Sequence, residues 1–341
     1  MADPIRHRVD EMWPLTSVWV TGQQSSPAQR RGRYVPESTQ HPARMLPAIA
    51  RHAIIAYTEP GDMVLDPMCG IGTTLVEAMH LGRDATGVEI EQRWCDLARA
   101  NIALAASQGA RGRAAVLCGD ATSIGQVVPA ALRGRYALLL TSPPYGPTVH
   151  GHVRPGPDGV HKSANRYSDH RHEGNLAHRD LRGLVDGFAQ ILAGSFSLLR
   201  PGGHVVVTAR PWRTRGELVD LPAAVVAAGV QAGLQPVERC VALLAALRDG
   251  RFVARPSFFQ LQQVRKAITR GVPLHLISHE DVLILRRPTD TSPPNQRGRA
   301  TARPATAGSL SPGAARAGTN GDTPPARHIL DTPSGDGGEV A

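Results

Sequence analysis

Aromatic residues are scarce and make up only 4% of this 341-residue chain. The core must therefore be built mainly from Ala, Val, Leu and Ile, and a hydrophobic content of 41% is enough for one large or two small domains. The chain has no run of about 18 apolar residues, so no transmembrane helix is expected. Its first residues also lack the apolar region of a secretion signal. We therefore expect no membrane partner.

Cysteine is equally scarce, with four residues and no Cys-x-x-Cys pair. This spacing gives no indication of a zinc knuckle or a redox pair, and no metal site is expected. Four separate thiols suit a reducing compartment, so a cytoplasmic location is expected. The residues are Cys69, Cys95, Cys118 and Cys240.

Acidic residues are fewer than basic residues, with 29 Asp or Glu against 38 Lys or Arg, which gives a formal net charge of +9. From Pro288 onward arginines and acidic residues balance, so the excess lies in residues 1–287. A basic body suits a polyanionic partner, although an Arg-rich composition alone would give the same charge. Residues 288–341 are dominated by Pro, Gly, Ala, Thr and Ser and are predicted to be a disordered tail.

Within residues 1–287, short apolar runs alternate with segments whose apolar residues recur at helical spacing. This alternation predicts a mostly parallel sheet with helices on both faces. A terminal antiparallel hairpin is expected from residues 237–247 and 281–286. Residues 23–33 are polar and are predicted to be a loop, whose arginines are more typical of a solvated surface than of a phosphate clamp. The expected strands are 63–66, 85–90, 114–118, 136–140 and 204–208, and the expected helices are 73–81, 91–108, 181–199 and 222–232.

Residues 61–74 read Gly-Asp-Met-Val-Leu-Asp-Pro-Met-Cys-Gly-Ile-Gly-Thr-Thr. A buried strand closed by Asp66, a turn with Gly70 and Gly72, and a helix opened by Thr73 form the first unit of a nucleotide-binding α/β sheet. The third glycine of the dinucleotide fingerprint is absent, because Leu75 stands in its place. A ligand with an amine and a carboxylate therefore fits better than a pyrophosphate.

The second motif is Ser142-Pro143-Pro144-Tyr145, directly after the apolar run 136–140. The prolines lack N–H groups and fix φ, which leaves their carbonyls free to face a ligand. Tyr145 offers a flat face for stacking. This combination is suited to gripping a planar group that carries an amino substituent.

Together the two motifs resemble those of the S-adenosylmethionine-dependent DNA amino-methyltransferases, which methylate cytosine N4 or adenine N6. The segment His41-Pro42-Ala43-Arg44-Met45-Leu46-Pro47 resembles the part of these enzymes that precedes the cofactor motif. The resemblance covers roughly residues 40–287. It implies a Rossmann-like class I methyltransferase domain at 41–287, after an N-terminal extension at 1–40.

The resemblance also implies a role for each motif residue. Glu89 would accept the ribose hydroxyls of S-adenosylmethionine, Asp120 the adenine amino group, and Asp66 the methionyl amine. The helix N-terminus would receive the carboxylate. Ser142 and Pro143 would accept the two N–H bonds of the target amine, and Tyr145 would stack on an extruded base. Expected cofactor residues are Asp66, Pro67, Gly70, Gly72, Thr73, Thr74, Glu89 and Asp120, and expected catalytic residues are Ser142, Pro143, Pro144 and Tyr145.

The partner implied is DNA. Ser in the first position of the catalytic motif favours cytosine N4. Two alternatives stay open: an RNA exocyclic-amine methyltransferase and a non-catalytic, cofactor-binding regulator. No separate target-recognition domain is evident, and the six-histidine stretch at 146–180 is interpreted as a lid or a nucleic-acid contact rather than a metal site.

Overall fold

The structure is a computed structural model, and it describes residues 15–144, 152–156, 159–163, 175–214, 217–256 and 258–289. The described residues all belong to one compact unit, Met1–Pro294. The predicted tail lies outside them from residue 290 onward. None of the described helices has the length and apolarity needed to cross a membrane.

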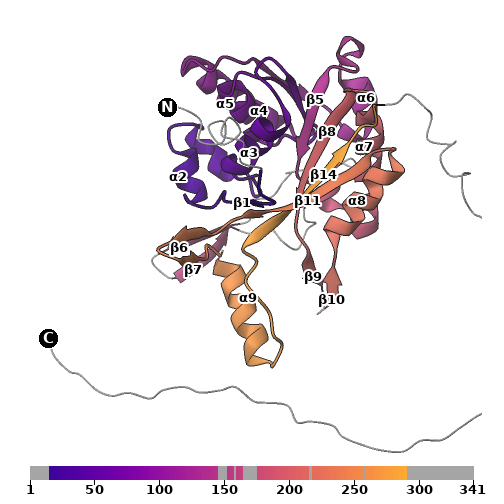
Figure 1. Ribbon diagram of the computed structural model, residues 1–341. Helices are drawn as coiled ribbons and strands as arrows, with labels where there is room; N and C mark the ends of the chain where they lie inside the picture. Colours follow the sequence, from indigo (N-terminus) through magenta and orange to yellow (C-terminus); the bar gives the residue numbers. More distant parts are fainter. Residues whose placement is uncertain are drawn as a thin grey trace, which may run out of the picture. The chain divides into compact units, whose positions relative to one another are not determined.

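The elements follow one another largely as the alternating pattern predicts (Figure 1). The strands are β1 (Val18–Trp19), β2 (Met63–Asp66), β3 (Asp84–Glu89), β4 (Ala114–Cys118), β5 (Tyr136–Thr141), β6 (His152–Gly156), β7 (Gly159–Ser163), β8 (Leu199–Ala209), β9 (Trp212–Thr214), β10 (Glu217–Val219), β11 (Gln235–Leu243), β12 (Ala246–Arg248), β13 (Arg251–Val253) and β14 (His279–Arg286). The α-helices are α2 (Ser26–Arg30), α3 (Pro47–Tyr57), α4 (Thr73–His80), α5 (Gln92–Ser107), α6 (Ile124–Val127), α7 (Leu181–Phe196), α8 (Leu221–Gln231) and α9 (Phe258–Thr269), and the 3-10 helices are η1 (Pro36–Gln40), η2 (Ala121–Ser123), η3 (Ala130–Leu132) and η4 (Leu176–His178).

Eight strands form one sheet in the order β1-β11-β14-β8-β5-β2-β3-β4. The pairs from β8 through β4 are parallel, whereas β14 runs antiparallel to both β8 and β11. This is the mostly parallel sheet with a terminal antiparallel pair that the sequence predicts. The fold class is confirmed as a Rossmann-like α/β fold with helices on both faces.

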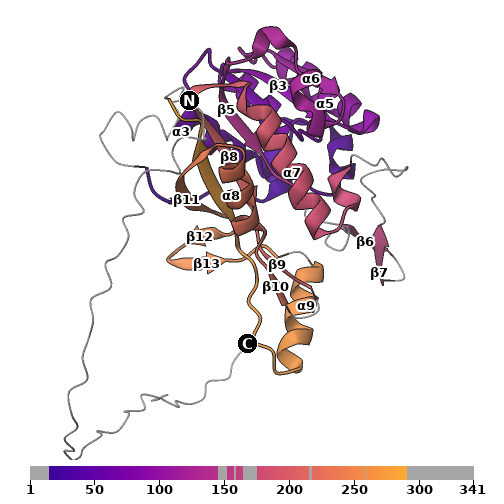
Figure 2. The same ribbon diagram turned by 90° about the vertical axis from the view of Figure 1, so that its right-hand side faces the viewer.

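Side chains of the central strands alternate between two cores. Leu65 and Leu139 face the core under α7 and α8, whereas Val64 and Leu138 face the core under α3, α4 and α5. Both faces are covered, as a parallel sheet requires. Figure 2 shows α7 and α8 on one side of the sheet.

Two local predictions are wrong. Residues 26–30 form helix α2 rather than loop, with Ser25 accepting a hydrogen bond from the Ala28 N–H as its cap. Residues 200–203 read Arg-Pro-Gly-Gly, which predicts a turn, but they lie inside the longer strand β8, where Gly202 has φ +75° and the register with β5 shifts. The sequence could not distinguish a turn from an irregularity within a strand, because Pro-Gly-Gly occurs in both turns and β-bulges.

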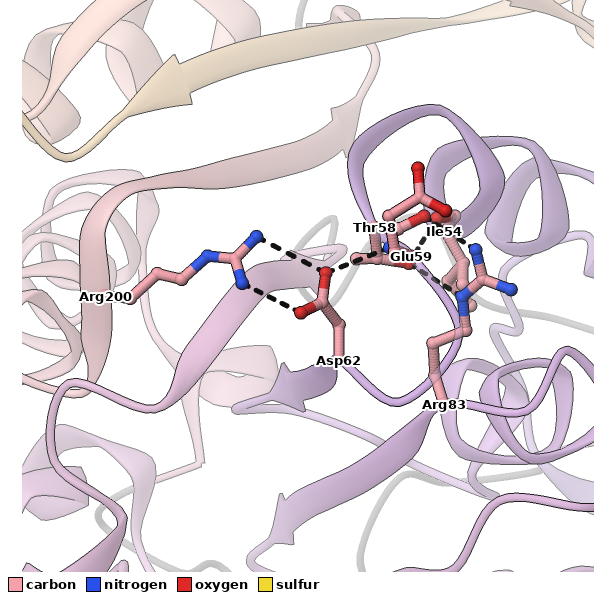
Figure 3. A network of polar contacts seen from close by, with 6 residues as sticks. All are labelled: Ile54, Thr58, Glu59, Asp62, Arg83 and Arg200. Atoms are coloured by element: carbon pink, nitrogen blue, oxygen red, sulfur yellow. Dashed lines mark hydrogen bonds and ion pairs between the residues drawn. The ribbon is translucent and has the colours of Figure 1, made fainter. Parts of the chain in front are cut away.

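A polar network fixes the edge of the sheet where β2 begins (Figure 3). The guanidinium of Arg200 donates to both oxygens of Asp62, at 2.8 and 3.3 Å. Nearby, Arg83 donates to the hydroxyl and the carbonyl of Thr58. These contacts join the end of α3, the loop before β2 and the bulge of β8.

Candidate functional site

The ends of four neighbouring strands carry the predicted polar residues. In the order β5-β2-β3-β4, the strands end at or just before Ser142, Asp66, Glu89 and Asp120. Register pairs Glu89 with Cys118, so β3 and β4 end level, whereas Asp66 pairs with Gly87, so β2 ends two residues before β3. Parallel strands thus bring together residues up to 76 positions apart in the chain.

Asp66 is buried and links the two predicted motifs directly. Its Oδ1 accepts a hydrogen bond of 2.9 Å from the hydroxyl of Thr141, at the end of β5. Its Oδ2 accepts from the hydroxyl of Thr74 at 2.6 Å, and Oδ1 also accepts from the Met68 N–H. Desolvation nonetheless raises the pKa of Asp66 to about 6, because burial penalises the charged form.

Glu89 is held by backbone donors alone. Oε2 accepts from the Gly70 N–H and Oε1 from the Glu91 N–H, each at 2.9 Å. Burial raises the pKa of Glu89 to about 7. Within the described residues neither Glu89 nor Asp66 forms a salt bridge, although Arg44 also lines the cleft that holds these two buried carboxylates.

The glycine turn places backbone where side chains would not fit. Gly70 has φ +52°, and a Cβ there would lie 3.1 Å from Nε2 of His41. Gly72 has φ +79° and caps α4, but it does not line the cleft, and a Cβ on it would face Ala98. Gly72 therefore contributes to the shape of the turn and not to the wall of the cleft.

A single cleft collects most of the predicted site. Asp120 lies on its wall and also accepts from the Thr122 N–H as the cap of η2, so the ordinary turn geometry is present and the ligand role of Asp120 stays a prediction. Tyr145 lies outside the described residues. The predicted residues that line the cleft are Asp66, Pro67, Gly70, Thr73, Thr74, Glu89, Asp120, Ser142, Pro143 and Pro144.

Trp94 and Asn175 also line the cleft and were missed from the sequence. Trp94 from α5 meets His41 edge-on at 4.6 Å between ring centroids. Asn175 also lines the cleft, and its amide donates to Glu91 Oε1 at 2.8 Å. Trp94 follows the second strand closely enough to have been suspected, whereas nothing in the sequence near Asn175 indicates a site.

The structure also corrects the expectation of four separate thiols. Cys95, at the start of α5, and Cys118, at the end of β4, form a disulfide. Cys69 and Cys240 are free and buried. The fold rather than sequence spacing creates the pair, because 23 residues separate the two positions.

Of the three arginines near residue 30, Arg31 is exposed as expected, whereas Arg30 and Arg33 contact other parts of the fold. Arg30 is buried, donates to the Thr73 hydroxyl at 3.3 Å and also donates to the Met45 carbonyl. Arg33 makes two hydrogen bonds of 2.7 Å to the buried carboxylate of Glu77, which Tyr34 also contacts. The N-terminal segment therefore holds the first turns of α4.

Comparisons with known proteins agree with this site. Residues 5–100 match the family model of the DNA methylases. The type II methyltransferase M.BglII of Bacillus subtilis is 40% identical over 62 residues, which are 18% of this chain and 17% of that protein. M.ScaI of Streptomyces caespitosus is 35% identical over 83 residues, which are 24% of this chain and 26% of that protein.

Among solved structures, TrmN from Thermus thermophilus aligns with a TM-score of 0.44 at 17% identity, over 76% of this chain and 53% of that one. The assignment of the fold rests on the sheet order rather than on this score. The two curated matches are short and cover about a quarter or less of the relatives' own length. The stretch that carries the glycine motif and the segment before it matches the DNA methylase family, which supports the resemblance over residues 5–100.

Proposed function

We propose that this protein is an S-adenosylmethionine-dependent DNA methyltransferase that acts on an exocyclic amino group. The observation that carries the proposal is the hydrogen bond between Thr141 and Asp66. It brings the end of the catalytic strand next to the cofactor strand, as direct transfer of a methyl group requires. The match of residues 5–100 to the DNA methylases supports the same activity.

The chemistry of the cleft fits the cofactor. Asp66 and Glu89 are buried carboxylates that form no salt bridge in the described structure, so a ligand with an amine and hydroxyl groups would satisfy their remaining acceptor capacity. Glu89 would take the ribose hydroxyls, Asp66 the amine and Asp120 the adenine amino group. The turn at Gly70 and the threonines Thr73 and Thr74 would lie along the methionyl part, with Pro67 beside them.

When bound, S-adenosylmethionine supplies a methyl group activated by a sulfonium. The chain's own task is to orient the nucleophile. An exocyclic amine conjugated to a base ring is weakly nucleophilic, and the Ser142 hydroxyl and the Pro143 carbonyl would accept its two N–H bonds. Pro144 has no N–H and a fixed φ, so it keeps this strand end extended. Catalysis then comes from proximity and polarity.

The target base must leave the duplex stack to reach the cleft, because an exocyclic amine inside a base pair is not accessible. Tyr145 is the proposed stacking surface. We favour cytosine N4 over adenine N6, because Ser142 occupies the first position of the catalytic motif.

Transfer of a labelled methyl group tests the proposal. Wild-type protein with labelled cofactor should label DNA, whereas Ser142→Ala should lose most of the transfer and still bind cofactor. Ser107→Ala, on the exposed end of α5, is the matched control and should transfer normally. Label found in RNA and not in DNA would replace the proposal with an RNA methyltransferase. Cofactor binding without transfer to either polymer would indicate a regulator.

A further inference from the structure

The segment between β11 and β14, residues 244–278, has a net charge of +5, which is more than half of the chain's +9. It contains six Lys or Arg and one acidic residue, Asp249. After Asp249 the next acidic residue is Glu280, so the intervening 30 residues contain none. We call residues 244–278 the basic insertion.

The sheet fixes where the basic insertion begins and ends. Leu243 pairs with His279, and the Leu244 N–H donates to the Ser278 carbonyl at 2.8 Å, so the two ends of the insertion lie together. Because β14 is antiparallel to β8, the insertion leaves the sheet at the edge where β8 and β5 end. That edge holds the cleft, and Glu280, two residues after the insertion, lines it.

Helix α9 presents the charge on one face. Val264 is buried. At 100° per residue, the opposite face carries Arg265, Lys266 and Thr269, with Arg270 immediately after the helix. All four of these side chains are exposed, and α9 itself carries no acidic residue. Gly271 (φ +74°) ends the helix, so the basic face is a defined surface.

A second part of the insertion is the hairpin of β12 and β13. Its two-residue Asp249-Gly250 turn has positive φ at both positions, as a tight hairpin turn of this type requires. The hairpin is anchored, because Arg248 donates to the Gln23 carbonyl and Arg255 to the Gly22 carbonyl. The hairpin also exposes apolar side chains, with Leu247 at 48%, Phe252 at 52% and Val253 at 38%.

We propose that the basic insertion is the surface that holds the DNA duplex against the cleft, with the α9 face contacting phosphates. This inference rests on the proposed function. The chemistry points to a polyanion, because a one-signed, solvent-exposed face, on an insertion that leaves the sheet at the edge of the cleft, repels cations and attracts phosphate. The insertion would therefore position the duplex through its phosphates rather than read its sequence.

The test compares two triple variants of the full-length protein that remove equal charge. One is Arg265→Ala, Lys266→Ala, Arg270→Ala on the α9 face. The control is Arg111→Ala, Arg133→Ala, Arg135→Ala, whose exposed side chains lie just before β4 and β5, at the opposite edge of the sheet. Binding to a fluorescent 30-base-pair duplex of mixed sequence is measured between 50 and 200 mM salt, with S-adenosylhomocysteine present.

The α9 variant should bind on the order of tenfold more weakly and lose about one unit of salt slope per residue removed. The DNA affinity of the control variant should stay within about threefold of the wild-type affinity, because the three substituted arginines lie far from the proposed contact. Cofactor affinity and melting temperature should be unchanged in both. The variant Arg265→Lys with Arg270→Lys keeps the charge and should bind the duplex about as tightly as the wild type. This result would separate a phosphate contact from a folding defect.

An unchanged affinity and salt slope in the α9 variant, in an enzyme that still methylates DNA, would overturn this inference and leave the proposed function standing. A wild-type protein that neither binds nor methylates DNA would overturn both. Tighter binding of an RNA of equal length, lost in the α9 variant, would overturn the choice of DNA.

Discussion

At the scale of single residues, Glu89 and Asp66 determine how the cleft responds to pH. Burial raises the pKa of Glu89 from an ordinary 4.5 to about 7 and that of Asp66 from 3.8 to about 6. Between the ordinary and the raised values, the folded protein holds protons that the unfolded chain has already released. The free energy of unfolding contributed by these groups therefore falls as pH rises from about 4 to about 7, and it is constant above that.

Cofactor affinity should change in the opposite direction. An ionised carboxylate only accepts hydrogen bonds, so it suits hydroxyl and ammonium donors, whereas a protonated one presents a competing donor. We expect S-adenosylmethionine to bind more tightly at pH 8 than at pH 6, with most of the change lost in Glu89→Gln. Isothermal titration calorimetry across this range measures it, and equal affinities at the two pH values in the wild type would contradict the role of Glu89.

Thr141→Val tests the contact between the two motifs. Valine keeps the shape of the buried side chain and removes the donor to Asp66. We expect the free energy of unfolding to fall by about 1–2 kcal/mol and the cofactor to bind more weakly, since one oxygen of Asp66 loses a partner. Urea unfolding and cofactor titration are the measurements. Thr269→Val, on the exposed face of α9, is the control for stability and cofactor binding and should change neither.

At the scale of elements, the N-terminal segment supports α4. The carboxylate of Glu77 is 2% exposed and receives hydrogen bonds from Arg33 and Tyr34. Removing one partner of a buried charge costs more than the pair contributes, because the other charge remains without compensation. The helix that opens at Thr73 thus depends on residues more than 40 positions earlier in the chain.

Arg33→Ala should therefore lower the free energy of unfolding by roughly 2–3 kcal/mol, because Arg33 is itself only partly exposed. Arg31→Ala, two residues away and exposed, should change it by less than about 0.5 kcal/mol. Chemical denaturation of both variants makes the comparison. Equal effects of the two substitutions would show that the ion pair does not support α4.

Element by element, the sequence predicts the central sheet well and its surroundings less well. Strands β2 and β5 are continuous apolar runs bounded by turn residues, so their position and burial follow from composition. Helix α2 was missed because its five residues include no apolar periodicity. Its stability comes from the contacts of Arg30 and from the Ser25 cap, and such long-range partners have no local signal.

At the scale of the whole molecule, the site could be predicted because parallel strands bring their carboxyl ends to one edge. Asp66, Glu89, Asp120 and Ser142 were found by that rule. Asn175 and the Cys95–Cys118 disulfide were not, because they depend on how connecting segments pack. The predicted roles of the site residues stay predictions until variants are assayed.

Deletion of residues 290–341 should leave folding and cofactor affinity unchanged, because β14 ends at Arg286 and every described cleft residue precedes it. Melting temperature and cofactor titration compare the shortened chain with the full-length protein. A lower melting temperature or a weaker affinity would assign these residues a structural role.

The most direct test of the central claim is mass spectrometry of nucleosides from DNA incubated with the protein and S-adenosylmethionine. The arrangement of Asp66 and Ser142 predicts a nucleoside methylated on an exocyclic nitrogen, with N4-methylcytosine as the favoured product. DNA that contains only ring-carbon methylation, or no methylated nucleoside, would contradict the proposed chemistry of the cleft.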